Sequence, residues 1–512
     1  MQEEMGERYG GNLKEIVSLG ILLSTLILYV FIGMAADPDL RKPASLAFGF
    51  QLACWAGAFV LLNHRNPHPE LRVSDPGLLY LFWCALYLIL PTIFWLCGAK
   101  IPWEEHITTD LGIELLWLHG IFIITIIGCY LAACPGKGIP LKIDVNRLPS
   151  GWVLFLAPIV LLIAEVLLRV AAGGSILPER TYGDTVEAYF DAHQTALGTG
   201  GLGYVWFQVR SKVIYYPVLI QGIGLGLIIS RSFGGRRYPW HTLAFVGIVI
   251  LAMIVFGSGA RSGFIMVFLV GLILADLLVG PIPWRYLLLA IVPGLVLFEL
   301  LGYYRVYRDL PLDIAISDTM EAYLTSDIPV LGEFTGMLSK EALVLQYVRD
   351  NRGIEGLNYL YQQFLALIPS QLVPWKLSWE PTGNLTSREL LGRGFFTGGG
   401  AAGTIIGDSF RFLGTLGVPL LAAILGGITG WTQRWLMSHS LTTGKTSLLR
   451  LGIWASFLGW AFGIIRNDLG NMLVLLLYSC AIPLLVLTLI LSKGRLSIWV
   501  EPLSRIARQS RV

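Results

Sequence analysis

Apolar runs long enough to cross a bilayer recur along most of this chain and alternate with shorter polar stretches. An α-helix of about 20 apolar residues spans the hydrocarbon core of a membrane. The pattern therefore predicts an all-α polytopic integral membrane protein with about twelve transmembrane helices. The predicted helices begin near Ile16, Ala44, Gly77, Leu111, Gly151, Lys212, Trp240, Ser262, Tyr286, Leu413, Arg450 and Leu469.

The composition agrees with a membrane protein and argues against several other classes. Of the 512 residues, 55% are hydrophobic and 14% are charged, whereas soluble domains carry about 25% charged residues. The net charge of +3 is too small to indicate a nucleic-acid-binding protein. The six cysteines lie within or beside apolar runs and form no CxxC pair, which indicates buried small side chains and not disulfides or metal ligands.

Lysine and arginine residues in the short loops predict the orientation of the chain, because basic loops stay in the cytoplasm. The C-terminal tail is basic, so we expect it to be cytoplasmic, and an even number of spans places the N-terminus there as well. The basic pair Arg41–Lys42 is the main exception, because this topology places it on the outer side of the membrane. The first apolar run is too long for a signal-peptide core, so we expect it to be a retained anchor.

Two larger polar segments fall on the outer side in this topology. The predicted regions are residues 1–303 with the first nine or so helices and an outer loop at 172–211, a long outer segment at 304–412, and residues 413–512 with about three helices and the basic tail. Within the long segment, the semi-apolar "GLNYLYQQFLALIPSQLVPW" is a candidate for a helix that lies on the membrane. We therefore expect the protein to work on the outer, periplasmic side.

Two arginine-containing stretches near predicted helix ends carry candidate binding chemistry. In "GSGARSG", Arg261 stands between apolar helices. It either snorkels to the interface or clamps an anion, because a guanidinium binds phosphate in a bidentate manner. In "ELLGYYRVYRDL", Arg305 and Arg308 interleave with Tyr304 and Tyr307. This stretch is either an interfacial aromatic belt with snorkelling arginines or a face that contacts lipid phosphate and sugar rings.

The stretch from residue 369 to 414 is rich in proline and glycine, which exclude a regular helix through much of it. Lys376, Arg388 and Arg393 supply cations there, and "TGGGAAG" is a candidate nest of backbone N–H groups for an anion. The stretch matches neither GxxxxGK[ST] nor a dinucleotide-binding fingerprint, so nucleotide binding is not expected. The alternative interpretation is a flexible lid.

Familiar metal-binding and hydrolase motifs do not occur in the sequence. It contains no HExxH, GxSxG or EF-hand pattern, and its one DxD, Asp37–Asp39, encloses Pro38. A turn around that proline explains the DxD. We therefore expect chemistry that needs no metal and no cofactor.

Asp408 and Arg411 lie three residues apart in "GDSFRFLGTLG", directly before a late apolar run. At this spacing both side chains lie on one side of a first helical turn, and an acid suits a helix N-terminus. Two interpretations stay open. Asp408 is a capping acid that pairs with Arg411, or it lies at the edge of an active site.

Three features occur in a characteristic order: an arginine after "GSGA", the stretch "LIPSQLVPWK", and "GDSFRFLGTLG" entering a span. Together they resemble the Wzy-type oligosaccharide repeat-unit polymerases of bacteria, which act on O-antigen, capsule or exopolysaccharide. That family carries a stretch like E-x-Y-x-N-F-G-x-x-G before a late span. The residues that match its acid, first aromatic position and glycines are Asp408, Phe410, Gly414 and Gly417. Phe412 replaces its asparagine, so a role of that asparagine does not carry over.

The resemblance implies a membrane glycosyltransferase of GT-C-like architecture in the bacterial inner membrane. Its donor is a growing glycan on undecaprenyl pyrophosphate, and its acceptor is a lipid-linked repeat unit. An acceptor hydroxyl attacks the donor anomeric carbon, and the pyrophosphate lipid leaves. This step needs a carboxylate that accepts the hydroxyl proton and cations that neutralise the pyrophosphate. Membrane lipids, a chain-length regulator and a flippase are the other partners implied.

The resemblance also assigns expected roles to residues of this chain. At the catalytic step, Asp408 is the expected base, and Arg261 and Arg411 are the expected clamp cations. The residues expected to bind substrate are Arg305, Arg308, Lys376, Arg388, Arg393, Tyr304 and Tyr307.

Three other functions are consistent with the same sequence. An O-antigen ligase-like enzyme uses the same donor and chemistry with a different acceptor. A lipid-linked oligosaccharide flippase or other transporter predicts charges that line a path through the spans, and mid-span ionisable residues such as Glu165 and Asp276 are few. A structural or assembly subunit predicts that the outer acids and arginines are dispensable.

Overall fold

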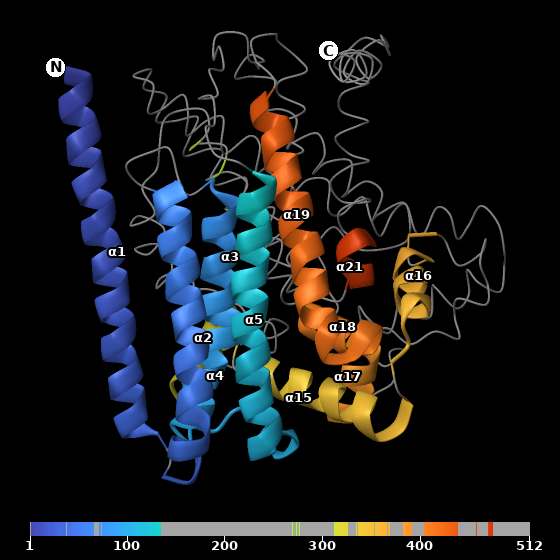
Figure 1. Cartoon of the computed structure of the whole chain (residues 1–512). Helices are drawn as coiled ribbons and strands as arrows, with labels where there is room; N and C mark the ends of the chain where they lie inside the picture. Colours follow the sequence, from blue (N-terminus) through green and yellow to red (C-terminus); the bar gives the residue numbers. More distant parts are fainter. Residues whose placement is uncertain are drawn as a thin grey trace.

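In the computed structural model, the regular elements of the described residues are all helices (Figure 1). The described residues are 2–36, 38–65, 71–72, 74–134, 269, 273, 276, 312–325, 334, 336–352, 354–365, 367–368, 382–391, 404–438, 457 and 469–474. Five helical segments in them are long and apolar enough to cross a membrane. They are Leu13–Ala35, Pro43–Arg65, Pro76–Leu96, Thr109–Ala133 and Ile405–Trp435. The chain is therefore a helical membrane protein, as its hydrophobic pattern predicts.

These five segments correspond to the spans that the sequence predicts from near Ile16, Ala44, Gly77, Leu111 and Leu413. The remaining predicted spans lie outside the described residues, apart from α21 (Leu469–Val474) at the start of the last one. One boundary is corrected. The fifth segment begins at Ile405 and not near Leu413, because Asp408 and Arg411 are enclosed by protein and do not lie in a solvated loop.

Helices from both ends of the described chain pack side by side as a bundle (Figure 1). They are α2 (Pro38–Arg65), α3 (Pro76–Cys84), α4 (Leu90–Leu96), α5 (Thr109–Ala133) and α19 (Gly417–Ser438). The first helix, α1 (Gln2–Ala35), lies at the edge of this bundle (Figure 1). Its apolar side chains are largely exposed, with Ile27 at 68%, which is typical of a helix that faces lipid.

The contact between α5 and α19 is close because α19 presents glycines to it. A Cβ atom at Gly426 would lie 2.2 Å from the carbonyl oxygen of Ile126, and one at Gly430 would lie 2.4 Å from that of Tyr130. Gly426 and Gly430 have the GxxxG spacing that lets two membrane helices approach backbone to backbone. This contact fixes the position of α19, and therefore of the polar helix that precedes it.

The third span is interrupted by a π-helical turn, η1 (Ala85–Ile89), between α3 and α4. Pro91 follows directly, and proline lacks the N–H that normally bonds a carbonyl one turn earlier. Within this turn, the carbonyl oxygen of Leu88 accepts from Thr92 Oγ1 at 2.8 Å and from Gln51 Nε2 at 3.1 Å. The irregular turn therefore offers a backbone acceptor to a polar side chain of α2 inside the bundle.

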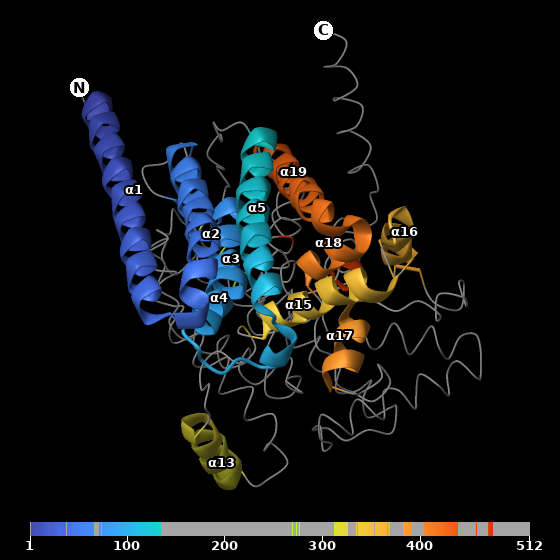
Figure 2. The ribbon, with the colours of Figure 1, turned by 60° about the horizontal axis from the view of Figure 1, so that its bottom comes forward.

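Four short helices lie beside the bundle, three of them toward its end opposite the N-terminus and α16 (Leu357–Leu365) at one side (Figures 1 and 2). The other three are α15 (Met337–Tyr347), α17 (Thr382–Leu391) and α18 (Ile405–Leu413). A further helix, α13 (Leu312–Thr325), lies apart from them (Figure 2). Arg388, Asp408 and Arg411 lie on helices of this group, and this end is called the site end below.

The helix α15 lies in the segment that the sequence predicts to be outer, and it packs against the bundle. Every residue from Met337 to Leu345 is buried, and Glu341 bonds His119 of α5 at 2.6 Å. His119 lies about 15 Å along α5 from its start, at 1.5 Å per residue. The polar side chains of α15 therefore find partners inside the protein, which their sequence spacing does not reveal.

Candidate functional site

The helix α18 carries the two charged residues that the sequence singles out, and it begins at a polar cap. The Oγ1 atom of Thr404 accepts from the N–H of Gly407 at 2.8 Å, so Thr404 is the N-cap. The interpretation of Asp408 as the capping acid is therefore wrong. Asp408 lies in the first turn, where the helix dipole still favours a negative charge.

Two glycines of the family pattern separate α18 from α19. Gly414 ends α18 with φ of +61°, a left-handed conformation that glycine adopts without strain. A short 3₁₀ turn, η7 (Gly414–Leu416), follows. A Cβ atom at Gly417 would lie 2.0 Å from the carbonyl oxygen of Ser409. Gly417 thus allows the start of α19 to approach the backbone of α18 closely, and the chain turns back tightly at this point.

Asp408 is fully buried, and its two carboxylate oxygens accept from different segments of the chain. The hydroxyl of Tyr359, on α16, donates to Oδ1 at 2.5 Å. The backbone N–H of Leu469, the first residue of α21, donates to Oδ2. The carboxylate therefore joins three segments that are far apart in the sequence.

Arg411 is also almost completely buried, with 5% of its side chain exposed. Its Nε and Nη2 atoms each lie 2.8 Å from Oε1 of Glu355, and the backbone N–H of Glu355 donates to the Arg411 carbonyl at 2.9 Å. Its Nη1 donates to Oγ1 of Thr382 at 3.3 Å, and the guanidinium lies 4.7 Å from the ring centroid of Tyr359. The carboxylate that binds this guanidinium directly is Glu355, a residue that the motif does not contain.

These contacts fix the direction of a hydrogen-bonded chain. An ionised Asp408 only accepts, so Tyr359 uses its hydroxyl hydrogen on Asp408. The hydroxyl of Thr382, 2.6 Å from that of Tyr359, must then donate to the Tyr359 oxygen and accept from Arg411. The order Arg411, Thr382, Tyr359, Asp408 runs from a cation to an anion, so each bond polarises the next. We call these four residues, together with Glu355, the Asp408 cluster.

The other residues predicted at the site divide into two groups. Arg388 is on α17, where it pairs with Glu389 at 2.8 Å and is 43% exposed, so this pair is a surface contact. The remaining predicted site residues lie outside the described part of the chain; they are Arg261, Tyr304, Arg305, Tyr307, Arg308, Lys376 and Arg393.

Sequence reasoning missed three members of the Asp408 cluster: Glu355, Tyr359 and Thr382. Each lies in the long segment that precedes α18, at a distance along the chain that no helical or strand spacing connects to Asp408. The amphipathic pattern of α16 is a partial signal. An amphipathic helix packs one side against the protein, and Tyr359 is on that buried side of α16.

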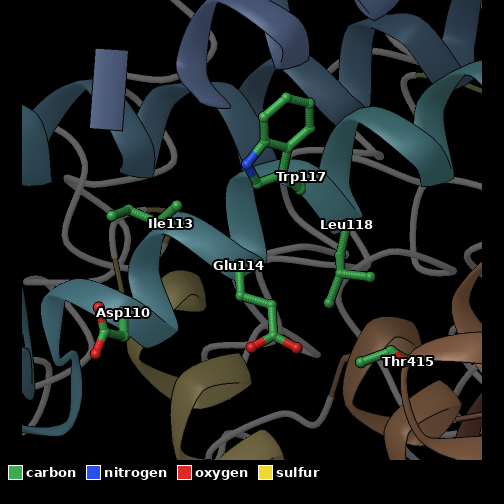
Figure 3. A pocket seen from close by; sticks show the side chains of 6 residues that line it. All are labelled: Asp110, Ile113, Glu114, Trp117, Leu118 and Thr415. Carbon is green, nitrogen blue, oxygen red and sulfur yellow. The ribbon is translucent and has the colours of Figure 1, made fainter. Parts of the chain in front are cut away.

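A pocket of about 430 Å³ lies next to the turn that ends α18 (Figure 3). Its lining residues are Asp110, Ile113, Glu114, Trp117, Leu118 and Thr415. Glu114 forms an ion pair with Arg349, in the π-helical turn η4 (Val348–Arg352) that follows α15. The pocket thus combines carboxylates, an indole ring and a hydroxyl at the site end.

A second buried polar cluster lies deeper in the bundle. His119 bonds Oε2 of Glu341 through Nε2 at 2.6 Å, and its Nδ1 lies 3.3 Å from Nε2 of Gln51. The Leu88 carbonyl can only accept, so it fixes the Gln51 amide with its nitrogen toward both Leu88 and His119. His119 must then accept at Nδ1 and donate from Nε2 to Glu341. The hydrogen-bond directions therefore define the tautomer of His119.

A buried lysine stands next to this acid in the sequence. Lys340 is 6% exposed, and its Nζ lies 5.8 Å from the ring centroid of Trp103. Burial lowers the pKa of Lys340 from 10.5 to about 8, while the charge of Glu341 opposes the shift. A protonated Lys340 therefore balances the charge of Glu341 near neutral pH.

Glu355→Gln tests how Arg411 is held. The variant leaves a guanidinium buried without its carboxylate, which should lower the free energy of unfolding by about 1–3 kcal/mol, less than for a completely buried pair. Thermal unfolding of the purified protein in detergent measures the loss. Glu389→Gln, at the exposed pair with Arg388, is the matched control and should change stability by less than about 0.5 kcal/mol. Equal stability of the two variants would contradict the ion pair.

Among the described residues, no group of three or more His, Cys, Asp or Glu side chains is arranged to hold a metal ion. The Asp408 cluster contains two carboxylates, and both already accept hydrogen bonds from protein donors. Its central feature is the Asp408 carboxyl group, whose two oxygens accept from oriented donors. Comparison with protein-family models, with curated proteins and with solved structures gives no match to this chain.

Proposed function

We propose that this chain is a membrane polymerase that joins oligosaccharide repeat units carried on undecaprenyl pyrophosphate, a glycosyltransferase of the Wzy type with GT-C-like architecture and about twelve spans. The observation that carries the proposal is the position of Asp408. A carboxylate with oriented donors is enclosed between α16 and the start of a membrane-spanning segment. A reaction on a lipid-linked sugar needs a base at such a place, because the reacting sugar sits at the membrane surface.

The surface of α16 supports a lipid-linked substrate. Its exposed side is apolar, with Leu357 76% and Phe364 55% exposed. Ile354, just before α16, lies 3.2 Å from the position of a Cβ atom on Gly414. The apolar side then continues through exposed residues of η7 and α19; they are Leu416, Leu420, Ile424, Ile428 and Trp431. A surface of this kind suits contact with lipid chains, so a polyprenyl tail can lie along it while its headgroup reaches α18.

The proposed step uses Asp408 as the general base. The acceptor O–H bond breaks and its proton passes to the Asp408 carboxylate. A bond forms between the acceptor oxygen and the donor anomeric carbon. The bond from that carbon to the pyrophosphate oxygen breaks, and its electrons stay on the leaving lipid pyrophosphate. No nucleotide, metal or redox partner is needed to balance this step.

Arg411 has a different role in the proposal from the one the resemblance implies. Its three nitrogens already donate to Glu355 and Thr382, so we assign it as a positioning residue that orients Thr382 and Tyr359 toward Asp408. The cations proposed to meet the pyrophosphate are therefore Arg261, Arg305 and Arg308, with Lys376, Arg393, Tyr304 and Tyr307 as further substrate contacts.

The proposed location is the bacterial inner membrane, with both termini in the cytoplasm and the site end on the periplasmic side. Deletion of the gene should leave single repeat units on the carrier lipid at the outer face. Extraction and mass analysis of the carrier-linked glycans measures this. Accumulated polymer on the carrier would indicate an O-antigen ligase-like enzyme instead. Complementation with the intact gene should restore long chains.

A transporter of lipid-linked oligosaccharide is the second candidate, and the cluster of Gln51, His119 and Glu341 favours it. Ionisable groups inside a membrane bundle often mark a transport or proton path. The mid-span Asp276, in contrast, pairs with Arg72 at 3.2 Å, close to the start of α3. In the deletion strain, repeat units that accumulate on the inner face would support this candidate over the polymerase.

A further inference from the structure

The buried side of α16 carries an amide with no hydrogen-bond partner. Gln363 is 0% exposed, and neither its Oε1 nor its Nε2 has a hydrogen-bond partner in the part of the chain that the structure describes. Oε1 of the adjacent Gln362 is also buried without a partner. Gln363 follows Tyr359 by four residues, so the two side chains lie on the same side of the helix. Tyr359 bonds Asp408, which makes Gln363 a neighbour of the Asp408 cluster.

An unpaired buried amide is costly, so its presence needs an explanation. A bound substrate that hydrogen-bonds the amide would explain why it is unpaired in the free protein. The amide offers a donor and an acceptor and carries no charge, which matches a neutral hydroxyl group, itself both donor and acceptor. A phosphate oxygen only accepts at neutral pH and would leave the amide oxygen unpaired. The chemistry of Gln363 therefore selects a polyhydroxylated, uncharged group such as a sugar.

We propose that Gln363 is a substrate-binding residue whose amide binds a hydroxyl of the acceptor sugar while a neighbouring hydroxyl of that sugar reaches Asp408. This inference rests on the proposed function. It also requires α16 to move, because Asp408 and Gln363 are both completely buried. In the free protein, the Tyr359 hydroxyl donates to Oδ1 of Asp408. When α16 moves away, a hydroxyl of the acceptor sugar donates to Oδ1 in its place.

The attachment of α16 fits such a movement. The helix has only nine residues, and Gly356 precedes it with φ of +63°, where glycine tolerates a change of backbone direction. Its outer side is apolar and exposed, with Tyr361 53% and Phe364 55% exposed. Its inner side is held by polar contacts through Tyr359, and a sugar can replace these contacts with its own hydroxyl groups.

Gln363→Met tests the unpaired amide and its role together. Methionine has a similar length and no hydrogen-bonding demand, so the variant should raise Tm in detergent by about 1–3 °C. In vesicles supplied with lipid-linked repeat units extracted from the deletion strain, KM should rise about tenfold with kcat within threefold, as expected for lost binding.

Gln433→Met on α19, which also removes a buried amide oxygen without a partner among the described residues, is the matched control and should leave KM unchanged. Gln363→Ala provides a second variant with the same expected KM.

The outcomes separate the inference from the function on which it rests. A fall in Tm for Gln363→Met would overturn the inference, because the amide would then be paired in the folded protein. A raised Tm with unchanged KM in both Gln363 variants would also overturn it, while the polymerase proposal would stand if Asp408→Asn is inactive in the same vesicles. If the intact protein forms no polymer there, the proposed function fails and the inference fails with it.

Discussion

Asp408→Asn is expected to abolish polymer formation and to leave single repeat units on the carrier lipid. Asparagine has the same shape but cannot take a proton from an acceptor hydroxyl. Its amide has one accepting oxygen and one donating nitrogen, so it cannot replace both carboxylate oxygens, which accept from Tyr359 and Leu469. General-base catalysis contributes about 10²–10⁴-fold, so residual polymer should be below about 1% of the intact protein. Carrier-linked glycans from the complemented deletion strain, resolved by size, measure this.

Ser409→Ala is the matched control for that experiment. Ser409 is the neighbouring residue and is also buried, and its hydroxyl donates to the carbonyl of Ile405 in its own helix at 2.8 Å. The alanine variant should make polymer of normal length. Equal membrane levels of both variants must be confirmed by immunoblot. Long-chain polymer in Asp408→Asn at those levels would show that Asp408 is a structural residue and not the base.

His119→Leu should produce the largest loss of stability. His119 is completely buried and is the group that donates to Oε2 of Glu341. Oε1 of Glu341 has no partner among the described residues. Leucine therefore leaves the buried Glu341 carboxyl group without its donor, a change that costs about 3 kcal/mol. Tm of the purified protein in detergent should fall by roughly 5–10 °C.

A double variant shows whether this loss comes from the pair. Replacing both partners by apolar groups of similar size is often nearly neutral. His119→Leu combined with Glu341→Met should therefore recover at least about half of the lost stability. His106→Leu is the control, because His106 lies 3.9 Å from an exposed Glu105, and it should change stability by less than about 0.5 kcal/mol. Simple addition of the two single effects would contradict a coupled buried pair.

The membrane-spanning segments in the described part of the chain could be predicted from the sequence because a span requires only length and apolar composition. Leu13–Ala35 and Thr109–Ala133 follow directly from runs that begin near Ile16 and Leu111. The fifth segment begins earlier than its apolar run predicts, because Asp408 and Arg411 are charged and only their contacts with Tyr359 and Glu355 make them interior residues.

The buried polar contacts could not be predicted from one sequence, since they join residues that no local period connects. His119 and Glu341 are 222 positions apart, and Arg411 and Glu355 are 56 apart. Lys340 and Glu341 have the composition of a solvated helix, and only packing against α5 makes them interior residues. Motif spacing identified Asp408 as the candidate acid, whereas the geometry identifies the residues that orient it.

The central claim is that this protein alone joins lipid-linked repeat units and that Asp408 takes the acceptor proton. The most direct test reconstitutes the purified protein in phospholipid vesicles with lipid-linked repeat units extracted from the deletion strain, without nucleotide or added metal. The products are separated by size after release from the lipid. We expect a ladder of two or more repeat units for the intact protein and single units for Asp408→Asn. Single units with the intact protein, or the same ladder with Asp408→Asn, would contradict it.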